Sequence, residues 1–117
     1  MSRTAMLDTT NRTERIRELN DTFRTTFHGG RVMLTSGFNA LPATLTAQAI
    51  ERVKTFSEFD AANDPHDEHD FVSFELEGLR FFAKIDYYDR DIRFGAEDPS
   101  DPDQTTRIMT IMLADEY

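Results

Sequence analysis

The sequence contains no cysteine and no long apolar run. Without cysteine the chain can form no disulfide, no thiolate zinc site and no thiol nucleophile, and this absence favours a reducing compartment. No stretch approaches the roughly eighteen apolar residues that a membrane-spanning helix needs. The first ten residues also have no apolar run of the kind found in signal peptides. We therefore expect a cytoplasmic protein with no membrane segment.

Recognisable catalytic motifs are missing as well. The chain has no G-x-S-x-G sequence, and no serine is placed recognisably beside a histidine, as nucleophilic catalysis would need. The Gly29-Gly30 pair lacks the further glycines and the preceding strand of a phosphate-binding loop. We therefore predict no catalytic residues and no cofactor, and we do not expect an enzyme.

Phenylalanine and acidic residues are abundant. Ten Phe and three Tyr supply apolar area for a core, although the hydrophobic fraction is 38%. The length of 117 residues is close to the commonest domain size. We predict a flexible N-terminus over residues 1–10 and a single domain over residues 11–117.

The net charge of −9 is unevenly distributed along the chain. Residues 58–103 contain fifteen Asp or Glu and four Lys or Arg, a net charge of −11, whereas the rest of the chain carries +2. Such a field repels nucleic acid and anionic membranes and attracts basic protein surfaces. We therefore expect no direct nucleic-acid or membrane binding and a protein partner with a basic surface. The alternative is that the charge serves solubility alone.

Apolar residues at helical spacing predict two helices. The first covers residues 11–27, where Asn11 and Glu14 form a capping pair and the Gly29-Gly30 pair ends the helix. The second covers residues 42–57, because proline is favoured in the first turn of a helix and one apolar face follows it. Both helices have charged residues between their apolar positions, as expected of helices with one solvated face.

The clearest local pattern predicts a β-hairpin over residues 71–88. Apolar residues alternate on both sides of Glu77-Gly78, which is typical of a two-residue turn. A slip of one residue would turn every apolar side chain to water, so the register is well determined. The predicted register pairs Leu76 with Leu79, Glu75 with Arg80, Phe74 with Phe81 and Val72 with Ala83.

The remaining segments give weaker patterns. Residues 31–35 and 92–94 are short strand candidates, and residues 58–70 are acidic and irregular. Residues 103–114, which follow the Asp-Pro pair at 101–102, fit either a helix with one apolar face or a strand rich in β-branched residues. We favour the helix. The elements together predict an α+β fold, with a small, largely antiparallel sheet of three or four strands and two or three helices packed on one face.

Metal-ligand residue types cluster over residues 64–70. His66 and His69 are flanked by carboxylates, and imidazole and carboxylate suit zinc, manganese or iron. The spacing fits neither H-E-x-x-H nor H-x-x-E-H, and the segment precedes a strand instead of lying on a helix. We therefore interpret it as a solvated acidic turn and predict no metal. The alternative is a metal-dependent enzyme that uses His66, Glu68, His69 and Asp70.

Two surfaces are candidates for partner binding. The outer face of the hairpin places Phe71, Phe82 and Tyr88 beside charged residues, as in many interfaces, unless a helix or the chain's own termini cover it. Carboxylates of the acidic middle can form a phosphate-like array, because alternate strand residues lie roughly 6.6 Å apart on one face. The partner-binding residues that we predict are Asp64, Asp67, Glu68, Asp70, Glu97, Asp98, Asp101, Asp103, Phe82 and Tyr88.

Four sequence strings carry a resemblance to a known family: Arg31-Val-Met-Leu-Thr-Ser-Gly, Glu68-His-Asp-Phe, Phe81-Phe-Ala-Lys-Ile-Asp-Tyr-Tyr-Asp and Thr110-Ile-Met-Leu-Ala-Asp-Glu-Tyr. Over residues 16–117 the chain resembles the bacterial domain-of-unknown-function family 3768. The resemblance implies a small protein of alphaproteobacteria, often encoded near plasmid or phage genes. That family has no established catalytic residues, so the resemblance assigns none here.

The resemblance and the charge together lead to an expected function. Small acidic proteins of mobile elements often bind host proteins, including nucleases and CRISPR effectors with basic grooves. We expect a protein-binding module of a mobile genetic element that inhibits a host nucleic-acid-handling enzyme, for example as a nucleic-acid mimic of the anti-CRISPR or anti-defence type. Two alternatives stay open: the metal-dependent enzyme, and a structural or regulatory homodimer with the aromatic hairpin face at its interface.

Overall fold

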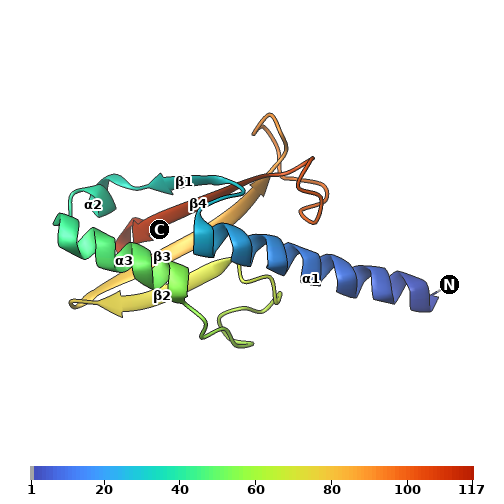
Figure 1. The fold of residues 1–117 in the computed structure, drawn as a ribbon, viewed down its shortest axis with the longest axis horizontal. Helices are drawn as coiled ribbons and strands as arrows, with labels where there is room; N and C mark the ends of the chain where they lie inside the picture. Colours follow the sequence, from blue (N-terminus) through green and yellow to red (C-terminus); the bar gives the residue numbers. More distant parts are fainter. Residues whose placement is uncertain (1) are drawn as a thin grey trace.

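The computed structural model describes residues 2–117, with side chains from residue 11 onward. Over this range the chain forms three α-helices, four strands and one short 3-10 helix, and the predicted α+β fold is confirmed (Figure 1). The elements in order are α1 (Ser2–Thr26), β1 (Arg31–Leu34), α2 (Ser36–Asn39), α3 (Ala43–Thr55), β2 (Phe71–Leu76), β3 (Leu79–Tyr88), β4 (Thr106–Leu113) and η1 (Ala114–Glu116).

The strands form one mixed sheet in the order β1-β4-β3-β2. The β2–β3 and β3–β4 pairs are antiparallel, whereas β1 runs parallel to β4, with Val32 opposite Met109. A parallel pair needs a long crossover connection, and here the whole of α2, α3, β2 and β3 lies between the two strands. The first and last strands of the chain are therefore neighbours.

The hairpin prediction is confirmed residue by residue. Leu76 pairs with Leu79, Phe74 with Phe81, Val72 with Ala83 and Glu75 with Arg80. The turn residues Glu77 and Gly78 have φ values of 54° and 76°, the left-handed pair that a tight two-residue hairpin turn requires. Glycine adopts this conformation at no steric cost, so the residue at position 78 itself favours the turn.

The helix prediction for residues 103–114 is wrong, because most of this segment is strand β4. Its burial alternates along the strand, with Arg107, Met109 and Ile111 buried on one side. β4 lies between β1 and β3, so its backbone gains two ladders of hydrogen bonds that a helix would forgo. The predicted strand at residues 92–94 is also wrong. There the chain turns, with Ile92 at a φ of 57°.

Helix α1 ends near the Gly29-Gly30 pair, as predicted, but it begins at Ser2 instead of Asn11. Asn11 is therefore an interior helix residue and the predicted capping pair is wrong, because no glycine or proline stops the helix upstream of it. The flexibility predicted for residues 1–10 stays a prediction, and Met1 lies outside the described residues. Helix α3 is confirmed within two residues at each end, whereas the four-residue α2 was not predicted.

The core lies between the sheet and the helices that cover one of its faces, α1 and α3 (Figure 1). Gly30 lies in the connection between α1 and β1. A larger residue does not fit at this position, because its Cβ would lie 2.6 Å from the carbonyl oxygen of Arg107. Within the described chain, no helix is both apolar enough and long enough to cross a membrane. The largest fully buried apolar side chains are those of Phe23, Phe38, Val53, Val72, Phe81, Met109 and Ile111.

Candidate functional site

The acidic residues gather in two loops that both contact helix α1. We call residues 58–70, between α3 and β2, the first acidic loop, and residues 89–105, between β3 and β4, the second acidic loop. Figure 1 shows the two loops on opposite sides of α1. Arg17 of α1 binds the first loop at Asp67, and Arg12 lies 3.8 Å from Asp98 of the second. The helix thus supplies cations to both loops.

Asp64 is an internal residue of the first acidic loop. It is 6% exposed, and its Oδ1 accepts hydrogen bonds from the backbone N–H groups of Glu68 and His69, both at 3.1 Å. A buried carboxylate that accepts two backbone hydrogen bonds holds the loop in shape, because the loss of the acceptor would leave both donors unsatisfied. The Asp64 carboxylate, predicted to bind a partner, therefore binds backbone groups of its own loop.

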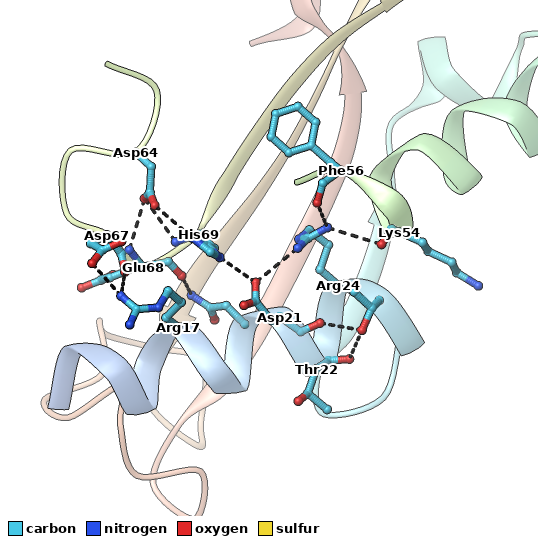
Figure 2. A network of polar contacts seen from close by, with 12 residues as sticks. Arg17, Asp21, Thr22, Arg24, Lys54, Phe56, Asp64, Asp67, Glu68 and His69 are labelled. Carbon is cyan, nitrogen blue, oxygen red and sulfur yellow. Dashed lines mark hydrogen bonds and ion pairs between the residues drawn. The ribbon is translucent and has the colours of Figure 1, made fainter. Parts of the chain in front are cut away.

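Two further side chains of this loop are bound to α1, as Figure 2 shows. Arg17 Nη1 donates to Asp67 Oδ2 at 2.6 Å and to the Asp67 carbonyl oxygen at 3.0 Å. His69 Nδ1 lies 2.9 Å from Asp21 Oδ1, which also accepts a hydrogen bond from Arg24 at 3.2 Å. These contacts join positions 48 and 50 residues apart, and for this reason no local sequence signal could have identified Arg17 and Asp21.

Glu68 and Asp70 are also partly internal. Tyr87 donates its hydroxyl to Glu68 Oε1 at 2.8 Å, and the Asn20 side chain donates to Tyr87 and to the Glu68 carbonyl oxygen. Burial raises the pKa of Tyr87, so the hydroxyl stays a donor. Burial also raises the pKa of Asp70, and the nearby Glu68 carboxylate adds to that shift.

Three side chains of the first loop could bind a divalent cation together. One ligand atom each from Asp64, Asp67 and His69 lie within 4.8 Å of one another, beside a cavity of about 330 Å³. Asp21 holds His69 Nδ1, an arrangement that orients many metal-binding histidines. The Arg17 guanidinium already neutralises Asp67, however, and this opposes cation binding. The exposed His66, as well as Glu68 and Asp70, are not members of the group.

The second acidic loop bonds mainly to itself. Asp98 Oδ1 accepts from the hydroxyl and the backbone N–H of Ser100, and these bonds hold the pKa of Asp98 below its usual value. Asp101 Oδ1 accepts from the backbone N–H of Asp103 at 2.9 Å. Among the described side chains, none forms an ion pair with Glu97, Asp101 or Asp103. Over the residues with described side chains, these three carboxylates therefore have no cationic group within 4.0 Å.

The sheet face opposite the helices carries the predicted aromatic residues. The rings of Phe71 and Phe82 lie 5.0 Å apart, and the ring of Tyr117 meets both edge-on at 6.3 and 5.8 Å. Lys84 on the same face lies 3.1 Å from Asp86 and below the Tyr117 ring, and Asp86 raises the pKa of Lys84. The chain's own C-terminal tyrosine thus covers part of this face. The sequence analysis left open that the chain's own termini cover this face, and the Tyr117 contacts agree with that alternative in part.

Tyr88 and Met33 extend the open sheet face beyond this aromatic cluster. Tyr88 pairs with Thr106 at the end of β3 next to the second acidic loop, and Met33 of the edge strand β1 is 53% exposed. We define the open sheet face as the half-exposed side chains of β1, β3 and β4 and the start of β2 that point away from the core. They include Met33, Phe71, Phe82, Lys84, Asp86, Tyr88 and Ile108.

These features define a small acidic α+β domain with a mixed four-stranded sheet, helices on one face and an aromatic open face on the other. A family model described as "Protein of unknown function (DUF3768)" matches residues 34–116. The chain therefore belongs to this family. Comparison with curated proteins and with solved structures gave no match.

Proposed function

We propose that this protein is a protein-binding module whose contact surface is the open sheet face, with the free carboxylates of the second acidic loop at its rim. The observation that carries the proposal is that Phe82 and Tyr88 are side chains of the same sheet face, and Tyr88 adjoins the loop that carries Glu97. Aromatic side chains are favoured at interface centres, and charged groups at the rim select partners and speed encounter.

The charge of the rim favours a partner with a basic surface. Glu97, Asp101 and Asp103 have no ion-pair partner among residues 11–117, whereas Asp64, Asp67 and Glu68 are engaged inside the protein. The second loop therefore supports the proposal, and the first does not. Enzymes that handle nucleic acid have basic grooves, so an inhibitor or decoy of such an enzyme is the form of the proposal that we favour.

A binding comparison at two salt concentrations tests the proposal. The wild-type protein is used as bait in a host lysate, beside the double variant Asp101→Lys/Asp103→Lys, the single variant Phe82→Ser and the control Glu51→Lys. Glu51 is exposed on α3, far in sequence from the rim, and its replacement reverses a charge of the same sign. We expect the wild type and Glu51→Lys to capture the same protein. Asp101→Lys/Asp103→Lys and Phe82→Ser should each capture much less of it, and high salt should abolish capture.

Two results would contradict the proposal. One is capture that salt and the rim variants leave unchanged, because electrostatic docking would then play no part. The other is equal loss with Glu51→Lys, because bulk negative charge would then explain binding. Sedimentation of the pure protein tests the homodimer alternative. If the wild type is a dimer and Phe82→Ser is a monomer, the open sheet face is the surface of self-association.

A metal-dependent function is a second candidate, because the ligand atoms of Asp64, Asp67 and His69 lie within 4.8 Å of one another. If these residues bind zinc or manganese, the melting temperature of the wild type rises when the ion is added. His69→Gln should lose the rise, whereas His66→Gln should keep it, because His66 is exposed and outside the group. An unchanged melting temperature in the wild type would remove this candidate.

A further inference from the structure

Two adjoining cavities lie where the end of α1 meets the start of β4. One has a volume of about 510 Å³ and the other of about 400 Å³. Both are lined by Gly29, Pro102, Thr105 and Arg107, so they are neighbours, and we call the two together the arginine cleft. Each volume lies in the range of small-molecule sites, about 300–1,000 Å³.

Arg107 is a buried cation with neutral partners. It is 2% exposed, its Nε donates to Asn20 Oδ1 at 2.8 Å, and its Nη2 donates to the Pro99 carbonyl oxygen. Its guanidinium lies over the Tyr87 ring at 5.2 Å. Among the described side chains, no carboxylate forms an ion pair with it. A buried charge without a counter-charge is costly, although neutral hydrogen bonds offset part of that cost.

Glu68 does not act as the counter-charge of Arg107. The Glu68 charge favours the protonated form of Arg107, but its Oε1 accepts from Tyr87, and Glu68 forms no ion pair with Arg107 among the described side chains. Burial lowers the pKa of Arg107, and the neighbouring Arg15 lowers it further. An arginine nevertheless stays protonated under physiological conditions. The sheet thus holds a permanent positive charge at the wall of a cleft.

The rest of the cleft is also basic, in contrast with the chain's net charge of −9. Arg15 and His28 line the larger cavity, and Arg31 and Arg90 line the smaller one. Among the described lining residues the one acid is Glu18, which lies 3.7 Å from Arg15. Four arginines from α1, β1, β4 and the second acidic loop therefore line two neighbouring cavities of an acidic protein, and Arg107 lines both.

We propose that the arginine cleft binds a small molecule through an oxyanion group, a carboxylate or a phosphate, with Arg107 as the anchor and the exposed arginines as its surroundings. Guanidinium groups bind both anions through paired, charge-assisted hydrogen bonds. The Asn20 and Pro99 contacts of Arg107 hold its plane in place before any ligand arrives, and this reduces the entropy lost on binding. The proposal does not depend on the open sheet face, although Pro102 of the cleft lies between the rim residues Asp101 and Asp103.

A titration followed by NMR of the full chain tests this proposal. Inorganic phosphate and acetate are added separately in Tris-chloride buffer, with sodium chloride at matched ionic strength as the blank. We expect saturable shifts of backbone amides around Gly29 and Thr105 with at least one of the two anions. Arg15→Gln and Arg90→Gln should each raise the dissociation constant, by roughly tenfold for a lost charge-assisted hydrogen bond. Arg52→Gln on α3 removes the same charge away from the cleft and should leave it unchanged.

The two anions distinguish the two classes of ligand, phosphates and carboxylates. Saturation with phosphate alone assigns the cleft to phosphate compounds, and saturation with acetate alone assigns it to carboxylates. Arg107→Lys tests the anchor, because lysine keeps the charge but loses the paired hydrogen bonds, and circular dichroism checks its fold. The surface variants keep the test valid if Arg107→Lys does not fold. Absence of saturation with both anions would overturn the proposal, and so would equal weakening by Arg52→Gln.

Discussion

The two acidic loops have similar compositions but opposite roles in the folded protein. In the first acidic loop, Asp64 accepts hydrogen bonds from backbone groups, Asp67 from Arg17, and Glu68 from Tyr87. In the second, the carboxylates mostly bond to residues two to four positions away, as Asp98 does with Ser100. The difference teaches that a count of charges does not show which charges another molecule can reach. Contacts within the loop decide that for Asp64, and contacts with Arg17 of α1 and Tyr87 of β3 decide it for Asp67 and Glu68.

The largest expected effect separates the loops directly. Asp64→Ala removes the acceptor of two backbone hydrogen bonds and should lower the free energy of unfolding by about 2–3 kcal/mol. Asp64→Asn keeps one oxygen and should restore part of the loss. Asp103→Ala in the second loop, where the side chain is exposed, should change stability by less than about 0.5 kcal/mol. Urea denaturation measures all three, and equal effects at both sites would break the comparison.

A smaller loss is expected where the first loop meets α1. Arg17→Gln removes the bonds to the Asp67 carboxylate and carbonyl, and should cost about 1 kcal/mol, because the Asp67 side chain is 71% exposed and water screens the pair. The wild-type advantage should shrink in high salt. Denaturation midpoints at low and high sodium chloride measure this. A difference that salt does not alter would indicate that packing of the arginine stem, not charge, is responsible.

Asp70→Asn should stabilise the protein modestly at neutral pH, by less than about 1 kcal/mol. The folded-state pKa of Asp70 is raised above its ordinary value of 3.8, so the fold favours the protonated form. That favourable contribution is complete below the unfolded pKa and is lost as pH rises through the folded one. At pH 7 the ionised carboxylate therefore opposes folding, and asparagine removes this cost. Denaturation series at pH 7 and below 3.8 should show the gain at pH 7 and its disappearance in acid.

The smallest effect is expected at the contact between α1 and the second loop. Arg12 and Asp98 lie 3.8 Å apart with side chains 61% and 39% exposed, so water screens the pair and Arg12→Gln should leave the free energy of unfolding almost unchanged. Thermal denaturation beside Arg17→Gln measures the contrast. A loss as large as that of Arg17→Gln would mean that α1 anchors both loops equally, and that the second loop is less free than its other contacts indicate.

Much of the fold could be predicted where local chemistry is decisive. The hairpin register follows from alternating apolar residues and from one turn that needs left-handed backbone at Glu77 and Gly78. Segment 103–114 could not be assigned in the same way, because its β-branched and apolar residues fit a helix or a strand. The neighbours β1 and β3, contributed by distant parts of the chain, decide for the strand.

The residues of the candidate sites also divide into those that local sequence patterns predicted and those that they did not. Sequence reasoning predicted Phe82, Tyr88 and acids of the second loop as partner-binding residues, from strand alternation and loop composition, and their binding role stays a prediction. It did not find the ion pair of Arg17 with Asp67, the support of His69 by Asp21, or the cleft around Arg107. The ion pair and the His69 contact each join residues 48 or 50 positions apart, and the cleft gathers residues from α1 and β4.

The amino-acid sequence by itself determined the hairpin, the helix α3, the excess of negative charge and the family. Each depends on neighbours a few positions apart or on composition. Tertiary structure alone decided which carboxylates are locked inside the first loop, which side of the sheet stays open, and where four arginines meet. The physical reason is that burial, ion pairing and the walls of a cavity depend on distances through space between elements far apart in the chain. The pairing of β1 with β4, for example, places Arg31 opposite Ile108, next to Arg107.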